Sequence, residues 1–414
     1  MEKLPAQLAE AARHVARTLA ESGYRGWIVG GAVRDLALGR TPKDVDMVSA
    51  AHPDRVLELF DQTHAVGKAF GIVVVRAAGS DLELATFRTE SGYSDARHPD
   101  RIQFAESPAV DACRRDFTCN AIYLDPLTGE LCDPCDGLAD LREGKLATVG
   151  EPQSRFAEDG LRLLRMARFA AQLGLEPAAG LVDAAAECVD TLDAVSSERV
   201  RAELEGCLGS GAADRALELL ERSNLIPACL PWFAGKASAV AQARQVLAAL
   251  GPSAAGPAGW ATLLGEVDAE SSTLVRRADA LRFSKAERQA LLRTSELAQN
   301  WATLSLQSTP LSERVFATRD EPWKPGWELA RARCAGQPDC PASDALAAWR
   351  EGLTAKQLNP KCPLGPQELE RAGIARGPHW SRLMRLAQAA VIDGELTDVK
   401  QVADWLSRNA DQDE

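Results

Sequence analysis

The chain has 414 residues, more than one hydrophobic core usually serves, so the sequence predicts several domains. Its 46% hydrophobic and 26% charged residues are typical of a soluble globular protein, and charges interrupt every apolar run before it reaches bilayer length. The net charge of −12 by itself argues against a nucleic-acid partner, but phosphate contacts depend on local basic patches, and residues 155–168 contain four arginines.

Residues 1–21 carry scattered apolar positions, as on an amphipathic helix, and lack the apolar core and cleavage site of a signal peptide. The ten cysteines have no regular spacing. We therefore expect a cytoplasmic protein with reduced thiols and no disulfide framework.

The first 150 residues alternate between predicted strands and helices. A strand at 27–29 runs into two glycines and a helix through Leu38, with Gly39 as its stop signal. The pattern then predicts a strand at 44–48, a helix at 52–62, strands at 71–76 and 82–88, and a polar loop at 89–100. After about residue 150, Leu and Ala dominate at helical spacing, so the chain reads as an α+β head followed by helical domains.

Two glycines and two aspartates in the head carry the clearest chemical signal. Gly30 and Gly31 stand between a strand and a helix, where the backbone approaches a phosphate closely and the helix N-terminus favours an anion. Arg34 on the first helical turn would add a charged donor to a triphosphate. Asp44 and Asp46 alternate on the next strand, so both carboxylates are expected on one face, roughly 6–7 Å apart at Cα. That spacing suits magnesium where phosphates complete its shell.

The same residues also have a structural interpretation, as a glycine turn, a surface arginine and two solvated aspartates. An Asp-x-Asp pair taken alone favours that interpretation. The Gly-Gly-x-x-Arg-Asp run at residues 30–35, directly before the pair, favours a phosphate and metal site instead.

A second signal lies on a helix expected to begin at Glu158. At about 100° per residue, one stripe of that helix contains Glu158, Arg162, Arg165 and Phe169, with Asp159 at its shoulder. The structural interpretation is an i,i+4 ion pair between Glu158 and Arg162 on a solvated helix, which is common. The functional alternative is that the stripe faces a ligand.

Five sequence blocks follow one another between residues 24 and 208. They are Gly-Gly-Ala-Val-Arg-Asp with Asp-Val-Asp at 30–46, Arg-Arg-Asp-Phe-Thr-Cys-Asn-Ala at 114–121, Asp-Pro-x-x-Gly at 133–137, Glu-Asp-Gly-Leu-Arg-Leu-Leu-Arg-Met-Ala-Arg-Phe at 158–169 and Ser-Glu-Arg-Val-Arg-Ala-Glu-Leu at 197–204. In this order they resemble the polymerase-β-like nucleotidyltransferases, in the class that holds bacterial tRNA nucleotidyltransferases and poly(A) polymerases. Any one block could arise by chance, but five in one order do not.

The resemblance implies a domain plan. A polymerase-β-like catalytic head with a small mixed sheet would occupy residues 1–150, followed by an all-α neck at 151–210 with the nucleotide-recognition helices. A helical body would follow at 211–310 and a helical, tRNA-binding tail at 311–414.

The resemblance also implies a reaction. Asp44 and Asp46 would hold magnesium, and Glu83 on a neighbouring strand is the candidate third carboxylate, its alternative being a half-exposed strand glutamate. Two magnesium ions would activate the tRNA 3′-hydroxyl, align it with the α-phosphate and neutralise the leaving pyrophosphate. The residues implied to bind the nucleotide are Gly30, Gly31, Arg34, Arg115, Asp116, Asn120, Glu158, Asp159, Arg162, Arg165 and Arg168.

The resemblance assigns base reading to Asp159 and Arg162. An aspartate accepts a hydrogen bond from the exocyclic amino group of cytosine or adenine, and an arginine donates to the neighbouring ring nitrogen. Uracil and guanine present the opposite pattern, which leaves polar groups unpaired and rejects them without a nucleic-acid template. Arg165 and Arg168 would bind phosphates or brace the pair. We expect Arg162→Ala to damage nucleotide choice more than folding.

Three functions remain open from the sequence. Addition of C and A from CTP and ATP to the tRNA 3′ end is favoured by the full-length loop at 89–99 and by residues 66–71, which resemble the CCA-adding and A-adding pattern. An A-adding enzyme or a poly(A) polymerase is the alternative with the same chemistry. A non-catalytic RNA-binding protein is the alternative of another class, against which the intact Asp44 and Asp46 argue. Gly160 replaces the proline usual in the family and loses its fixed φ.

Overall fold

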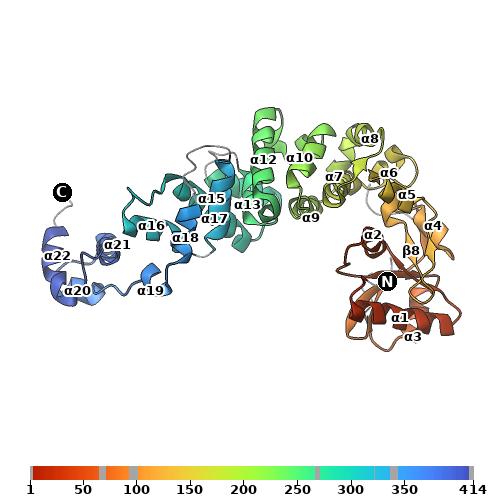
Figure 1. Cartoon of the computed structure of the whole chain (residues 1–414), viewed down its shortest axis with the longest axis horizontal. Coiled ribbons are helices and arrows are strands. Elements are labelled where there is room, and N and C mark those ends of the chain that lie inside the picture. The colour runs from red at the N-terminus through yellow and green to blue at the C-terminus, as the bar shows by residue number, and fades with distance from the viewer. Residues whose placement is uncertain are drawn as a thin grey trace. The chain divides into compact units, whose positions relative to one another are not determined.

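The computed structural model describes residues 3–64, 71–92, 101–265, 271–320, 322–335 and 344–409. The chain divides into two compact units, Met1–Arg244 and Gln245–Glu414 (Figure 1). Among the described residues, no helix has both the length and the apolar character needed to cross a membrane. The finer division into head, neck, body and tail stays a prediction.

A mixed seven-stranded sheet forms the centre of the first unit. Its strands are β1 (Gly26–Val29), β2 (Asp46–Ser49), β3 (Thr63–His64), β4 (Ile72–Ala77), β5 (Ser80–Thr86), β8 (Tyr123–Leu124) and β9 (Leu131–Cys132), in the order β3-β4-β5-β2-β1-β8-β9. Only the β2–β5 pair within this sheet is parallel. This small mixed sheet and the helices that follow confirm the expected α+β class.

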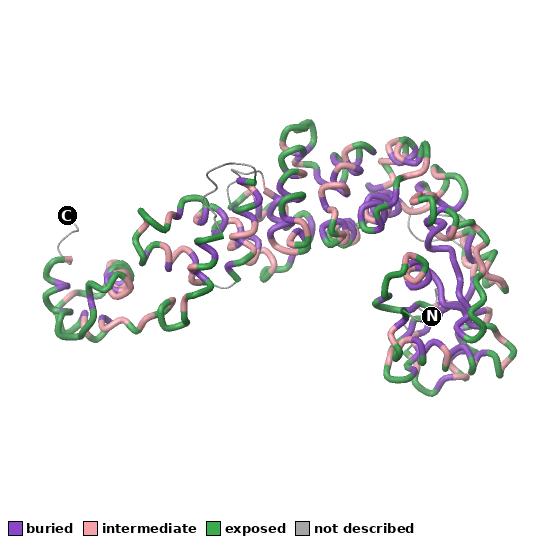
Figure 2. Tube along the Cα trace, in the orientation of Figure 1, coloured by how far each residue is buried: buried purple, intermediate pink, exposed green. Residues whose placement is uncertain are grey.

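Helices cover the sheet. The helix α1 (Ala6–Glu21) packs against β1, β4 and β5, and α3 (Pro53–Leu59) packs against β4 (Figure 1). Gly26 permits the approach of α1, because a Cβ there would lie 2.9 Å from a methyl carbon of Leu19. An apolar cluster at the sheet includes Trp27, Val48 and Tyr123. Figure 2 shows that much of the chain in this unit is buried.

The segment predicted as a polar loop is partly a hairpin. Strands β6 (Arg88–Ser91) and β7 (Arg101–Phe104) pair antiparallel, so the loop expected from residue 89 begins later than predicted. Residues 93–100 lie outside the described part of the chain, as do residues 65–70. The functional expectations for both stretches therefore stay predictions.

Short elements connect the sheet to helices in the first unit. They are α2 (Gly31–Ala37), α4 (Pro108–Ala112), η2 (Thr118–Asn120), α5 (Gly137–Arg142), β10 (Lys145–Leu146), α6 (Pro152–Glu158), α7 (Leu161–Leu173), β11 (Glu176–Pro177), α8 (Leu181–Glu187), η3 (Val189–Ala194), α9 (Ser197–Leu208), α10 (Ala213–Arg222), α11 (Ile226–Cys229) and η4 (Pro231–Phe233). Most residues of α7 are buried, and the helix packs against both α9 and α10.

The second unit is helical. Its elements are α12 (Ala237–Leu250, which begins in the first unit), η5 (Gly251–Ala254), α13 (Pro257–Leu264), α14 (Ser271–Ala280), α15 (Lys285–Thr303), α16 (Leu311–Thr318), α17 (Lys324–Arg333), α18 (Asp344–Glu351), α19 (Ala355–Leu358), α20 (Pro366–Arg371), α21 (His379–Ile392), η6 (Val399–Gln401) and α22 (Val402–Asn409). Helix α15 packs against α13 and α17, and Trp301 is fully buried there. Near the C-terminus, Trp380 and Trp405 belong to a separate apolar cluster.

Eight cysteines of the described chain are free thiols, while Cys334 is disulfide-bonded. Six of the eight are buried or packed against a core, among them Cys119 and Cys207. The expectation of a chain without a disulfide framework therefore needs one qualification, at Cys334 in the second unit.

Candidate active site

Strand register brings the glycine turn and two carboxylates together. Val29 at the end of β1 lies opposite Asp46, and Asp46 lies opposite Glu83 on β5. Residues paired across neighbouring strands point to the same face of the sheet, and the strands are about 4.8 Å apart. Gly30 follows Val29 directly, so the turn begins beside Asp46.

Asp44 lies in the loop before β2, because the strand begins at Asp46. The expectation that both aspartates alternate along one strand is therefore wrong. In the antiparallel register Asp44 would face Gly31, but the chain turns away at Gly30, with φ 73°, and Gly31 starts α2. Asp44 nevertheless stays close enough for its charge to act on Asp46.

Asp46 lies among like charges that raise its pKa. Loss of hydration, then the charges of Glu83 and Asp44, raise the pKa of Asp46 to about 6, although its side chain is solvent-accessible and Arg115 opposes the shift. Among the described residues, no three acidic, histidine or cysteine side chains form a metal cage by themselves. Two or three clustered carboxylates suit a divalent cation that completes its shell with phosphate oxygens, and such a cation would relieve the repulsion.

Two arginines border the glycine turn. A Cβ built on Gly30 would lie 3.7 Å from Nη1 of Arg115, and one built on Gly31 would lie 3.5 Å from Nη2 of Arg34. The turn therefore presents bare backbone beside two guanidinium groups. Such an arrangement of N–H groups and positive charge favours an anion.

Arg34 is 6% exposed, so it lies beneath the turn instead of reaching into solvent. Its Nη1 donates to Oδ1 of Asn120 at 2.8 Å, while Nε and Nη2 donate to Oδ1 of Asp35 at 3.0 and 2.8 Å. The side chain thus ties α2 to η2 and fixes the start of the helix.

Asp111 is a residue that the sequence interpretation missed. It is fully buried, and it accepts hydrogen bonds from Arg114, Arg115 and the hydroxyl of Tyr123. Burial opposes its charge, but Arg115 and Arg114 outweigh burial and lower the pKa of Asp111. The signal was present, since an acid three and four residues before two arginines forms ion pairs on a helical turn.

Asp116, Asn120 and Arg165 form a connected polar group. Asn120 donates to Oδ1 of Asp116 at 3.1 Å, and Nε of Arg165 donates to Oδ2 at 2.7 Å. Burial alone would raise the pKa of Asp116, but Arg165 and the hydrogen bonds lower it to about 2. Asp116 therefore stays ionised and links the segment after α4 to helix α7.

The recognition segment is a turn between two helices and not one helix. Helix α6 ends at Glu158, Asp159 is extended with φ −149° and ψ 107°, and α7 begins at Leu161. The expected stripe from Glu158 to Phe169 is therefore wrong at its first turn, because the helical period breaks at Asp159 and Gly160. Arg162, Arg165 and Phe169 do share α7.

Both oxygens of Asp159 have partners. Oδ1 accepts from the backbone N–H of Leu161 at 3.0 Å, and Oδ2 accepts from Nη2 of Arg199 on α9 at 3.0 Å. A carboxylate accepts about four hydrogen bonds, so each oxygen retains acceptor capacity for a base amino group. Arg199 lies in the block at 197–204, but its partner, 40 residues away, could not be read from the sequence.

Arg162 is more enclosed than a solvated helix would allow. Its side chain donates to the carbonyls of Arg155 and Arg114 at 2.9 and 3.0 Å and pairs with Glu158 at 2.5 Å. The predicted Glu158–Arg162 ion pair therefore forms, but on a residue only 8% exposed. Arg162 holds the recognition turn and the segment after α4 together.

Arg168 pairs with Glu203 of α9, with 2.7 Å between Nε and Oε2. Gly206 on the same helix makes room for it, since a Cβ there would lie 2.3 Å from Cδ of Arg168. Arg168 therefore links α7 to α9, and its expected roles, binding phosphates or bracing Asp159 and Arg162, stay predictions. The predicted site residues thus all lie in the first unit.

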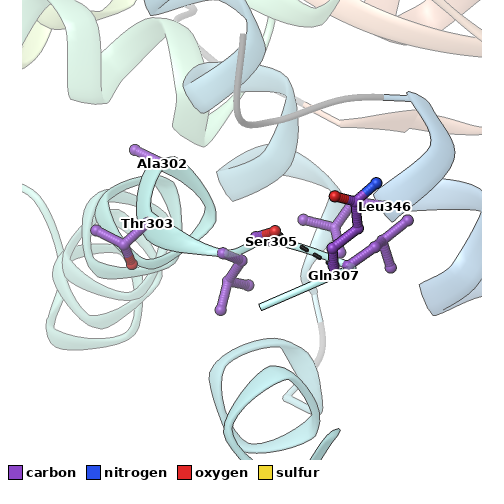
Figure 3. A pocket seen from close by; sticks show the side chains of 7 residues that line it. Ala302, Thr303, Ser305, Gln307 and Leu346 are labelled. Carbon is purple, nitrogen blue, oxygen red and sulfur yellow. Dashed lines mark hydrogen bonds between the residues drawn. The ribbon is translucent and has the colours of Figure 1, made fainter. Parts of the chain in front are cut away.

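A cavity of about 470 Å³ lies elsewhere, in the second unit. Residues 302–307 and Leu346 line it, and Figure 3 shows its polar side chains, among them Ser305 and Gln307. No lining side chain is charged. The cavity therefore lacks the groups that metal or phosphate chemistry requires.

Two family models match the chain. The Poly A polymerase head domain matches residues 26–147, which hold the sheet and the glycine turn. The probable RNA and SrmB-binding site of polymerase A matches residues 174–235.

Similar proteins match half of the chain or more. A CCA-adding enzyme from Geobacillus stearothermophilus is 33% identical over 95% of both chains, and one from Bacillus pumilus is 42% identical over about half of each. The crystal structure of the Bacillus stearothermophilus CCA-adding enzyme in complex with CTP is 29% identical, with a TM-score of 0.80 over 98% of both chains. The Thermotoga maritima enzyme complexed with tRNA shares the fold, with 17% identity and a TM-score of 0.69. The chain belongs to the CCA-adding enzymes, the tRNA nucleotidyltransferases that add C and A without a template.

Proposed function

We propose that this chain completes the 3′ CCA end of tRNA by transferring CMP and AMP from CTP and ATP, with release of pyrophosphate. The observation that carries the proposal is the row of Val29, Asp46 and Glu83, which sets a phosphate-type glycine turn beside paired carboxylates. The relatives support the choice of nucleotides, since solved family members bind CTP and ATP.

Asp44 and Asp46 are the proposed magnesium ligands, with Glu83 as the third carboxylate. Bound magnesium would supply the charge that activates the tRNA 3′-hydroxyl and neutralises pyrophosphate. Gly30 and Gly31 would bind the phosphates through backbone N–H groups.

Selection of the base would depend on the turn between α6 and α7. Asp159 offers acceptor capacity to the amino group of cytosine or adenine, and its orientation is fixed at both oxygens. Arg162 has three acceptors on its two Nη groups, which leaves donor capacity for a ring nitrogen. A base with a carbonyl in place of the amino group would leave Asp159 unpaired.

The second unit would bind the tRNA. Arg319 and Arg385 both stack on Phe316, with 4.9 and 5.5 Å from each guanidinium carbon to the ring centroid, and Arg314 stacks on Trp349 at 4.7 Å. Arginine planes beside aromatic rings suit phosphates and bases of RNA. Because tRNA maturation is a cytoplasmic process, we also place the protein in the cytoplasm.

Single-nucleotide end labelling tests the proposal. A tRNA that ends before CCA should gain two residues with CTP alone, none with ATP alone and three with both. Addition of A only, or of open-ended A tails, would favour the alternative A-adding activities, and tRNA binding without pyrophosphate release would favour a non-catalytic protein. Glu58→Gln, an exposed acid on α3, is the control for carboxylate variants.

A further inference from the structure

One aromatic ring in the first unit contacts three guanidinium groups. Phe169 on α7 is 5% exposed, and its ring centroid lies 5.2 Å from Cζ of Arg34, 5.1 Å from that of Arg165 and 4.3 Å from that of Arg168. All three distances fall within the range of a cation–π interaction. Phe117 meets the same ring edge-on at 5.7 Å.

These arginines come from two parts of the unit. Arg34 belongs to α2 beside the glycine turn, whereas Arg165 and Arg168 belong to α7, six and nine residues after Asp159. The ring of Phe169 therefore contacts both α2, beside the glycine turn, and α7.

Carboxylates and the ring hold different parts of each guanidinium. Arg34 donates hydrogen bonds to Asp35, and Arg165 donates one to Asp116. Arg168 forms an ion pair with Glu203. A ring within cation–π distance restrains the position of a guanidinium group, which a carboxylate alone leaves free to swing. Its negative face also offsets the repulsion among three cations, which an aliphatic side chain of similar size would not do.

A hydrogen-bonded path closes the arrangement. Arg34 donates to Asn120, Asn120 donates to Asp116, and Arg165 pairs with Asp116. Arg34 and Arg165 thus meet twice, once through these polar groups and once through the ring. A displacement of either arginine is transmitted to the other.

We propose that Phe169 is a positioning residue. Its ring holds Arg34, Arg165 and Arg168 so that the glycine turn and helix α7 keep one relative geometry. The inference rests on the proposed function, because it requires that the glycine turn receives a triphosphate.

The test compares two variants at residue 169 in the full chain. Phe169→Leu keeps an apolar side chain and removes the ring. Replacement by mono-, di- and trifluorinated phenylalanine keeps the shape and weakens the negative face stepwise, which decides the question even if the leucine variant folds poorly. Phe233 in η4 is 2% exposed and stacks on no arginine of the described chain, so the same changes there are the control.

We measure the Kd for CTP and for inorganic triphosphate by calorimetry with magnesium, together with KM, kcat and Tm. Phe169→Leu should raise the Kd for both ligands and the KM for CTP about tenfold, and the fluorinated series should raise them in proportion to fluorine number. At saturating CTP, kcat should change less than KM. The Phe233 variants should lower Tm alone.

A flat response to fluorination at residue 169, or a Phe169→Leu variant that loses Tm while its KM stays at the wild-type value, would overturn the proposal. Both results presuppose a wild-type chain that adds C and A. If the wild type adds neither, the proposed function fails first, and the two failures are thereby distinguished.

Discussion

At Asp46, the clustered carboxylates proposed to bind metal also repel one another and lower the stability of the metal-free fold. Glu83 and Asp44 act on it with like charge, and its pKa is raised to about 6. A raised carboxyl pKa means that the folded state binds a proton more tightly than the unfolded chain, so stability is lost as pH rises through that range. A cation is the natural partner for such a group.

Asp46→Asn should therefore separate stability from activity. Nucleotide addition should fall to background, while the metal-free protein at pH 7 gains about 1 kcal/mol in unfolding free energy, a figure discounted for the exposure of the side chain. Thermal unfolding with and without magnesium checks this: magnesium should raise the Tm of the wild type and not of the variant. A variant that loses stability would count against repulsion among these carboxylates.

Gly160 has a different role from the one its sequence context indicates. Its φ of −57° is one that proline would also adopt, so backbone freedom is not what requires glycine. A Cβ there would lie 2.4 Å from the carbonyl oxygen of Thr191 in η3. The close approach of η3 explains the glycine.

Gly160→Ala should force η3 and the recognition turn apart. We expect a loss of about 1–3 kcal/mol, as for other overpacked sites, and a fall in the preference for CTP over UTP because Asp159 is the neighbouring residue. Urea unfolding and misincorporation assays measure the two effects. Gly256→Ala is the control, since a Cβ there meets nothing within 4 Å and its φ is extended; equal effects at both glycines would contradict the argument.

At the scale of elements, the contacts of Arg162 indicate a folding cost of Arg162→Ala that the sequence did not indicate. Its partners lie on two segments, α6 and the segment after α4, so truncation leaves partly buried acceptors unpaired. Arg162→Ala should cost about 2–4 kcal/mol in folding as well as nucleotide choice. Arg162→Lys, which keeps the charge without the fork of donors, should fold better and still misincorporate. Unfolding free energy and C-to-U selectivity, measured on both variants, decide between these outcomes.

The Asp116–Arg165 pair predicts how α7 stays docked as pH falls. The folded pKa of Asp116, about 2, is below its unfolded value, so its contribution is present above about pH 4 and lost as pH falls toward 2. Asp116→Asn should cost about 2 kcal/mol at pH 7, and the difference from wild type should shrink below pH 4. Unfolding at constant ionic strength across that range measures it. A difference that stays constant with pH would contradict the pairing.

Much of the first unit could be predicted from residue types and their local spacing. Contacts between residues far apart in the sequence could not. The strand at 27–29, the glycine turn and the helix after it follow from residue type and spacing. The place of Asp44 depends on the register with β1, and the partner of Asp159 is Arg199 on another helix. The helical spacing of Glu158 and Arg162 also continued across the break at Gly160, because residue spacing on either side of a turn can match by accident. These features depend on tertiary contacts.

At the scale of the whole molecule, the two units are expected to divide the work between catalysis and tRNA binding. The net charge of −12 means that RNA must be held by local positive groups. Helices α16 and α21 supply one, anchored where Ser312 donates to Asp393 through its N–H at 2.8 Å and its hydroxyl at 2.5 Å. Arg385 on α21 is exposed, stacks on Phe316 and pairs with no carboxylate in the described part of the chain.

Arg385→Ala should therefore weaken the tRNA complex without touching the nucleotide site. We expect KM for tRNA to rise about three- to tenfold, with the KM for CTP and the Tm unchanged, because the side chain is exposed and its loss leaves no buried group unpaired. The slope of log K against log salt should fall by about one, as for one lost phosphate contact. Arg371→Ala is the matched control, an exposed arginine of α20 that pairs with Glu368. If both variants bind tRNA like the wild type, α21 does not contact RNA, and the tRNA surface of the second unit lies elsewhere.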